Sequence, residues 1–175
     1  KAPLESYIAL IAALKPIYGA LEKAADRVSR SCPAVASVCD DTLPQLRRYE
    51  SLESDLAYYR RRCPDMTKRA EAFARRSKAT NEYVASLDSW PTTGPKAEAL
   101  VAHLYTRYLG DLSGGQILRR AAVRAYGLTP PGGTTLDAVD GVRFYDFKLI
   151  GKPTKLRRFK DEYRRRLDDL RVADG

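Results

Sequence analysis

The stretch VAHLYTRYLGDLSGGQ, residues 101–116, carries the most information about the fold of this 175-residue chain. Its first half follows helical spacing, yet Gly110, Gly114 and Gly115 fall within six residues. Each glycine inside a helix costs roughly 1 kcal/mol relative to alanine, so such a cluster is unfavourable unless the helix bends there or another group approaches its backbone. The pattern therefore predicts a kinked helix with a bare face, beside which Asp111 places a carboxylate.

Two interpretations of this cluster remain open from the pattern alone. In one, Gly110 and Gly114 let a flat ligand lie directly against the helix, on the face that they share with Arg107 and Asp111. In the other, the glycines mark a helix-loop-helix turn capped by Asp111 or Ser113, or the close packing of two helices. The second interpretation is the commoner one for a glycine cluster of unknown context.

Outward from this stretch, the sequence predicts helices from end to end and one domain over residues 1–175. Apolar residues at spacings of three and four predict helices over 4–27, 44–62, 67–87, 96–109, 116–126 and 154–172. Pro16 should bend or break the first of these, and Thr67 can cap the third. Residues 29–41 and 129–151 are rich in turn-forming residues. The first of these regions has room for one short turn of helix, and 144–147 suits a short extended segment packed on the core. The predicted fold class is all-α.

Composition limits the class of protein further. Thirty-one Lys and Arg against 22 Asp and Glu give a net charge of +9, which favours an anionic partner: nucleic acid, an acidic protein, anionic lipid or a carboxylate-bearing ligand. Three cysteines without CxxC spacing and a single histidine argue against a disulfide framework, a zinc site and a multi-histidine metal centre, and favour an intracellular, reducing compartment. The sequence contains no run of 18 apolar residues, so no membrane span is expected.

The last predicted helix concentrates the positive charge. Residues 152–171 contain nine Lys and Arg and four Asp and Glu, and so contribute +5 of the net charge. Arg157, Lys160 and Arg164 follow three-four spacing beside an apolar stripe, where they could hold the carboxylates of a ligand. The commoner alternative is a solvated basic face.

The stretch over residues 101–116 closely resembles the distal-helix signature of the mammalian-type heme oxygenases. Further similarity lies, in the family's order, in the segments YGALE (18–22), LESDLA (52–57), FYDF (144–147) and FKDEYR (159–164). The resemblance implies a heme-oxygenase-like helical bundle with a glycine-kinked distal helix. It favours the ligand interpretation of both the glycine cluster and the basic helix.

On the distal side, the resemblance implies that Gly110, Gly114 and Gly115 lie over heme, which is both substrate and cofactor. Asp111 is implied to hold water that delivers protons to bound oxygen, without ligating the iron. Asp111, Gly110 and Gly114 are therefore the expected catalytic set.

At the other edge of heme, the resemblance implies that Tyr105, Lys160 and Arg164 lie near the propionates, where cations form charge-assisted hydrogen bonds. The implied reaction is the oxidative cleavage of heme to biliverdin, carbon monoxide and iron. It uses oxygen and electrons from a reductase, whose surface is expected to be acidic.

In this family the proximal histidine lies on a helix before the one predicted from Leu4, and the fold continues past the basic helix. The domain is therefore expected to be incomplete at both ends, with the axial ligand absent from this chain. His103 is not expected to replace it, because it lies on the distal helix seven residues, about 10 Å, before Gly110.

Three functions follow as hypotheses. The first is a heme oxygenase, and the second is a catalytically inactive relative with a heme-binding or regulatory role. The third is a basic helical module that binds nucleic acid or protein. Since the sequence has no recognisable DNA-binding motif, nucleic acid is not the expected partner.

Overall fold

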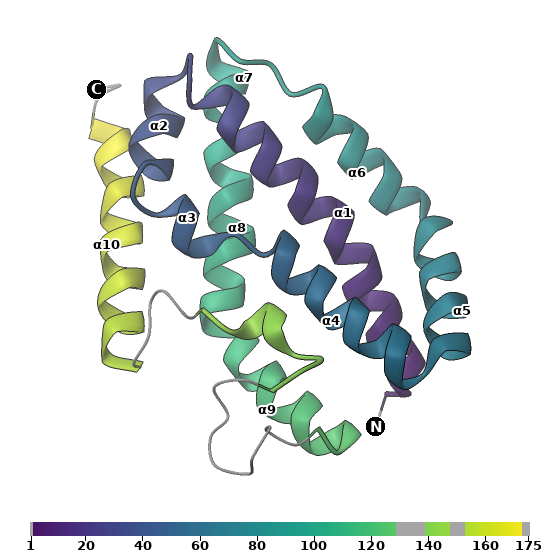
Figure 1. Ribbon diagram of the computed structural model, residues 1–175. Coiled ribbons are helices and arrows are strands. Elements are labelled where there is room, and N and C mark those ends of the chain that lie inside the picture. Colours follow the sequence, from purple (N-terminus) through teal and green to yellow (C-terminus); the bar gives the residue numbers. More distant parts are fainter. Residues whose placement is uncertain (1, 129–138, 148–152, 173–175) are drawn as a thin grey trace.

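The computed structural model describes residues 2–128, 139–147 and 153–172, which form a bundle of helices (Figure 1). No residue within these ranges lies in a strand, and the all-α prediction is confirmed. The elements are α1 (Leu4–Val28), α2 (Pro33–Cys39), α3 (Leu43–Leu46), α4 (Tyr49–Arg62), α5 (Pro64–Arg75), α6 (Lys78–Asp88), α7 (Pro95–Glu98), α8 (Leu100–Ser113), α9 (Gly115–Tyr126), the 3₁₀ turn η2 (Arg143–Tyr145) and α10 (Pro153–Val172).

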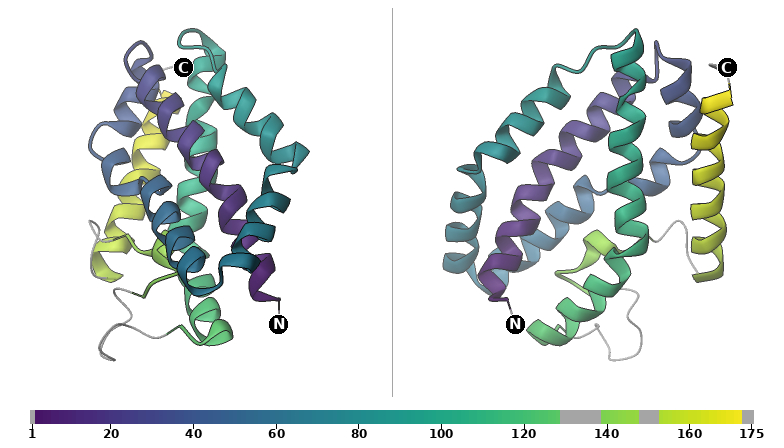
Figure 2. Two further views of the ribbon diagram at one scale, coloured as in Figure 1. Left: turned by 45° about the vertical axis from the view of Figure 1, so that its right-hand side comes forward. Right: turned by 180° about the vertical axis from the view of Figure 1, so that it is seen from behind.

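Helix α1 is the central helix of the bundle. It packs against α4, α5 and α6, and its apolar stripe buries Ile8, Ile11 and Leu21 completely (Figure 2). Burying a side chain of this size contributes about 1.5–3 kcal/mol. Pro16 lies inside α1 without ending it. By length and composition α1 could cross a membrane, but this is weak evidence because its apolar stripe is already covered by neighbouring helices.

The helix predicted over residues 44–62 is divided into α3 and α4. The interruption lies at Arg47 and Arg48, and a buried carboxylate from α1 stabilises it. Glu22 accepts hydrogen bonds from the backbone N–H groups of Arg48 and Tyr49, at 2.6 and 3.0 Å. These N–H groups at the start of α4 have no partner within the helix, so Glu22 caps α4 from another helix.

The helix predicted over residues 67–87 is also divided. Helix α5 begins at Pro64, and Thr67 lies inside it with its hydroxyl donating to the carbonyl of Cys63 at 2.9 Å. The prediction that Thr67 caps this helix is therefore wrong. Ser77 is the cap of α6, because its Oγ accepts a hydrogen bond from the N–H of Thr80 at 3.3 Å.

The remaining differences concern short elements. Residues 29–41 contain α2, which at seven residues is longer than the single turn of helix expected there. The helix predicted from residue 96 begins with the separate turn α7. The segment at 144–147 is packed on the core as expected, but it includes the 3₁₀ turn η2 instead of being fully extended. Of the irregular region predicted over 129–151, residues 129–138 and 148–151 lie outside the described residues.

Candidate functional site

The glycine-rich stretch forms the junction of α8 and α9. Helix α8 ends at Ser113, α9 begins at Gly115, and the axis changes direction between them (Figure 1). The N–H of Gly114 donates to the carbonyl of Gly110 at 2.8 Å, and the carbonyl of Gly114 accepts from the N–H groups of Ile117 and Leu118. The chain therefore bends at Gly114, as predicted, while the N–H and carbonyl groups of Gly114 stay hydrogen-bonded.

The three glycines have different surroundings. A Cβ atom on Gly110 would meet no atom within 4 Å, and one on Gly114 would meet only the carbonyl oxygen of Gly110, at 3.5 Å. Gly115 is buried, and a Cβ there would lie 3.1 Å from the ring of Tyr145. Gly110 and Gly114 thus leave exposed, bare backbone. Gly115 faces η2 and packs against Tyr145, and its expected contact with a cofactor stays a prediction.

Asp111 is bound by a tyrosine from the central helix. The hydroxyl of Tyr18 on α1 donates a hydrogen bond to the Asp111 carboxylate. Burial raises the pKa of Asp111 to about 6, although the Tyr18 hydrogen bond and the charges of Arg48 and Arg107 oppose the rise. A carboxyl group with such a pKa exchanges protons near neutral pH, which suits a group that holds or transfers protons.

Burial and the neighbouring Asp111 charge raise the pKa of Tyr18, so its hydroxyl stays protonated and acts as a donor. Tyr18 was not among the residues expected at the site. Its segment YGALE matched the family, but no local pattern joins residues 93 positions apart. Only the packing of α1 against α8 brings them together.

A cavity of 490 Å³ opens beside this pair, between α1, α6 and α8. Its walls carry hydroxyl, carboxyl, guanidinium and imidazole groups. They include Tyr18, Tyr83, His103, Thr106, Arg107, Gly110 and Asp111. A water molecule occupies about 30 Å³ in the liquid, so a cavity of this size has room for several waters beside these polar groups.

His103 lines this cavity, and two aromatic side chains hold its ring in place. Its Nδ1 lies 2.7 Å from the hydroxyl of Tyr83, and its ring stacks on the Tyr83 ring and meets Trp90 edge-on. Burial and the charge of Arg107 lower the pKa of His103, which favours a neutral ring that shares a hydrogen bond with the Tyr83 hydroxyl. That His103 does not ligate iron stays a prediction.

A second cavity, of 980 Å³, lies between α2, α7, α8 and α10. Tyr105 and Arg164 both line it, as does Ala102, which also lines the first cavity. The exposed face of α8 therefore lies between two adjoining hollows. Arg164 also pairs with Asp161 on its own helix, at 3.3 Å.

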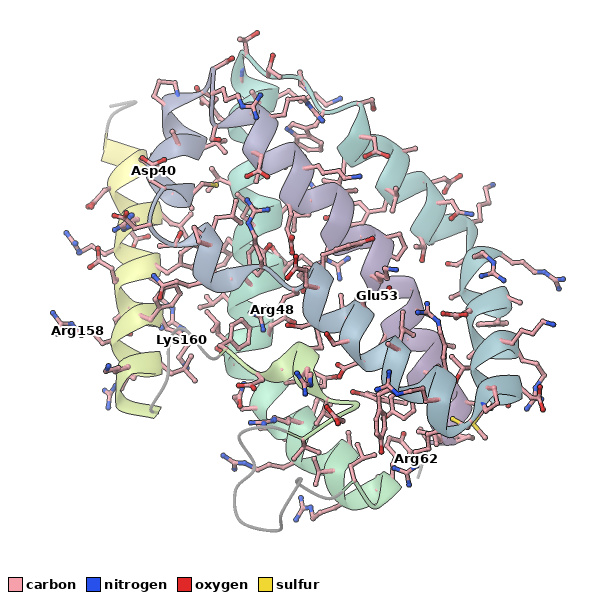
Figure 3. All side chains as sticks on the ribbon, in the orientation of Figure 1. Asp40, Arg48, Glu53, Arg62, Arg158 and Lys160 are labelled. Atoms are coloured by element: carbon pink, nitrogen blue, oxygen red, sulfur yellow. The ribbon has the colours of Figure 1, made fainter. Side chains whose placement is uncertain are left out.

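Lys160 lies one turn before Arg164 on α10. Figure 3 shows Lys160 on the side of α10 that faces α8, whereas Arg158 points away from the bundle. Lys160 is half-buried, and Arg158 is exposed. The structure thus brings Tyr105 and Arg164 together at one cavity, with Lys160 on the neighbouring turn.

These features fit a flat, carboxylate-bearing ring such as heme. The bare backbone at Gly110 and Gly114 gives a ring room to approach, and Arg164 of α10 lines the neighbouring cavity. Asp111 and Tyr18 provide a hydrogen-bonding pair on the same side as the bare backbone. Among the described residues, no group of three His, Cys, Asp or Glu side chains is placed to hold a metal ion directly.

Comparison with known proteins agrees with this geometry. The family model described as heme oxygenase matches residues 1–175. The chain belongs to the heme oxygenase family.

Curated heme oxygenases resemble the chain over nearly its whole length. The heme oxygenase of Pyropia yezoensis is 41% identical over 171 residues, which cover 97% of this chain and 62% of that protein. Heme oxygenase 1 of Nostoc sp. is 35% identical over 170 residues, again 97% of this chain and 62% of the relative. The chain thus spans about three-fifths of the length of these relatives.

Solved heme oxygenase structures share its fold. The structure of heme oxygenase-2 from Synechocystis sp. PCC 6803 in complex with heme and NO has a TM-score of 0.76 and 32% identity, and the match covers 97% of this chain and 62% of that one. Heme oxygenase-1 from the same cyanobacterium, in complex with heme, has a TM-score of 0.73 and 33% identity over 96% of this chain and 65% of its own.

Proposed function

We propose that the protein containing this chain is a heme oxygenase that cleaves heme to biliverdin, carbon monoxide and iron, using oxygen and electrons from a reductase. The observation that carries the proposal is the Tyr18–Asp111 hydrogen bond beside the exposed backbone of Gly110 and Gly114. Family membership across residues 1–175 and the fold shared with heme-bound relatives support it.

When bound, heme supplies the iron at which oxygen reacts and the porphyrin edge that is oxidised. Gly110 and Gly114 allow the ring to approach the backbone of α8, because they place no side chain in its way. Asp111 holds water in the adjoining cavity and passes protons from it. Tyr18 fixes the orientation of the Asp111 carboxyl by donating to it.

Lys160, Arg164 and Tyr105 bind the heme carboxylates in this proposal. Arg164 and Tyr105 line the same cavity, and Lys160 lies on the side of α10 that faces α8. A hydrogen bond to a charged partner is about twice as strong as a neutral one, so this edge of the site sets the orientation of the ring.

The basic surface suggests the partner and the compartment. A net charge of +9 suits an electron-donating reductase with an acidic face. Cys32 and Cys39 are buried free thiols, which favours a reducing compartment.

The test is product formation by the full-length protein. Purified protein is given heme, oxygen, a ferredoxin or flavoprotein reductase, and NADPH, and biliverdin and carbon monoxide are measured by absorbance and gas analysis. Stoichiometric biliverdin and carbon monoxide are expected. Tight heme binding without either product would favour the inactive heme-binding relative, and failure to bind heme would reject both.

A further inference from the structure

Residues 139–147, which we name the strap, lie between α4 and the α8–α9 junction and contain η2. The site described above does not use them. Their packing is nevertheless close, since Phe144, Tyr145 and Phe147 are all buried. Hydrogen bonds from α1, α4 and α9 hold the strap in place.

Charged side chains from α4 and from the residue just before it bind the backbone of the strap. Asp55 is completely buried, and its two carboxylate oxygens accept hydrogen bonds from the backbone N–H groups of Arg143 and Phe144, at 2.7 and 2.8 Å. Arg48, labelled in Figure 3, donates to the carbonyls of Phe144 and Asp146, at 3.3 and 2.7 Å. A carboxylate and a guanidinium therefore bind the backbone of the strap from both its N–H and its carbonyl groups.

The beginning of the strap is fixed as well. The hydroxyls of Tyr7 and Tyr59 both donate to the carbonyl of Gly141, each at 3.2 Å. Gly141 has a φ of +86°, and a Cβ there would lie 2.7 Å from the Tyr59 hydroxyl oxygen. Only glycine fits this close approach.

Two contacts lead from the strap to the site. The ring of Phe144 meets the ring of Tyr18 edge-on, with centroids 5.4 Å apart, and Tyr18 donates to Asp111. The carbonyl of Tyr145 accepts a hydrogen bond from Gln116 at 2.8 Å, next to the point where its ring packs against Gly115. The strap therefore supports both the tyrosine that binds Asp111 and the first turn of α9.

We propose that Asp55 is a positioning residue of the heme site. By holding the backbone of the strap, it fixes Tyr18 and the start of α9, and through them the direction of the Asp111 carboxyl relative to the bare face of α8. Its effect on catalysis rests on the proposed function. Its effect on Asp111 is a property of the protein without heme.

The test compares Asp55→Asn with Asp140→Asn in the full-length protein. Asparagine has one acceptor oxygen, so it cannot accept from both N–H groups of the strap. Asp140 is the matched control, because it lies on the strap itself but is partly exposed, and within the part of the chain that the structure describes it pairs with the side chain of Arg143. Three quantities are measured: amide hydrogen exchange at Arg143 and Phe144, the pKa of Asp111 by carboxyl NMR, and kcat and KM for heme.

For Asp55→Asn we expect exchange at Arg143 and Phe144 to rise at least about ten-fold. The pKa of Asp111 should rise, because a displaced Tyr18 no longer stabilises its charged form. A fall of about ten-fold in kcat, with a smaller change in KM, is expected to accompany it. Asp140→Asn should leave all three quantities near their wild-type values.

Faster exchange in Asp55→Asn with an unchanged Asp111 pKa would overturn the proposal, because the strap would then be loosened without moving the site. If Asp55→Asn does not fold, the variant Phe144→Leu is tested instead. It keeps the hydrogen bonds of Asp55 to the strap backbone and an apolar side chain, but it removes the ring that meets Tyr18. A raised Asp111 pKa in that variant supports the proposal, and an unchanged one rejects it. Since the first two measurements need no heme, they hold even if the protein proves not to cleave heme.

Discussion

The two sides of the α8–α9 junction use glycine for opposite purposes. On one side, Gly110 and Gly114 face open space, so the missing side chains leave backbone accessible to a ligand. On the other side, Gly115 is buried against Tyr145, so the missing side chain allows two elements to pack closely. One glycine cluster therefore combines the exposed backbone that the ligand interpretation requires with the close packing that the other interpretation requires. The kink lies between these two parts of the cluster.

The largest effect is expected from removing the carboxylate on the open side. Asp111→Ala should keep heme binding but reduce biliverdin formation by about 100-fold or more, since a positioned proton-transfer group contributes typically that much. Turnover by the full-length variant is measured with wild-type protein as the reference. Wild-type turnover by Asp111→Ala would refute its assigned role.

A second test uses the pH dependence of stability in the heme-free protein. Because the folded-state pKa of Asp111 is about 6, above its unfolded value, the folded state binds its proton more tightly. This stabilisation is present at low pH and is lost as pH rises from about 4 to about 6.

Asp111→Asn removes that contribution, so the free energy of unfolding should fall less over this range in the variant than in the wild type. The expected difference is roughly 2 kcal/mol, measured by urea denaturation at several pH values. The raised pKa values of Asp55 and Glu22 act in the same direction in both proteins, which makes the difference between them the informative quantity. Parallel curves would mean that Asp111 titrates normally.

The proposed binding of the heme carboxylates is tested by removing the cations of α10. The double variant Lys160→Ala, Arg164→Ala should weaken heme binding about ten-fold or more and change the biliverdin isomer formed, because charge-assisted contacts to the ring would be lost. Arg158→Ala is the matched control, since Arg158 points away from the bundle on the same helix. If heme affinity and the biliverdin isomer are unchanged in the double variant, α10 would instead belong to the surface that binds the reductase.

The glycine comparison itself predicts two stability changes of opposite sign, each about 1 kcal/mol. Gly110→Ala should stabilise the heme-free protein, because alanine favours a helix and its Cβ meets nothing. Gly115→Ala should destabilise it, since the clash with Tyr145 costs more than the helix gains. Both are measured by urea denaturation, and a shared sign would contradict the division of the cluster. Heme affinity should fall in Gly110→Ala.

The smallest effect is expected at His103. The variant His103→Ala should leave the axial ligation of bound heme unchanged. His103 lies on α8, the expected distal helix, and its ring is held against Tyr83 and Trp90. Absorption and resonance Raman spectra of the heme complex provide the measurement. A histidine-ligated spectrum that disappears in the variant would overturn the distal placement of α8.

The sequence by itself determined the local features of this protein. Spacings of three and four among apolar residues predicted the long helices, because a helix repeats every 3.6 residues and needs one buried face. The cost of clustered glycines predicted the kink, and the motif around Asp111 predicted the kind of ligand. Each of these properties is encoded within a few neighbouring residues.

Only the tertiary structure decided how distant residues meet. Glu22 caps α4, Tyr18 donates to Asp111, and Asp55 binds the strap 88 and 89 positions along the chain. No local pattern encodes these pairs, because a buried carboxylate and its partner are brought together by the packing of whole helices. The same packing turned Gly115 toward Tyr145 and left Gly110 open, which is why residues of one type in one motif acquired different roles.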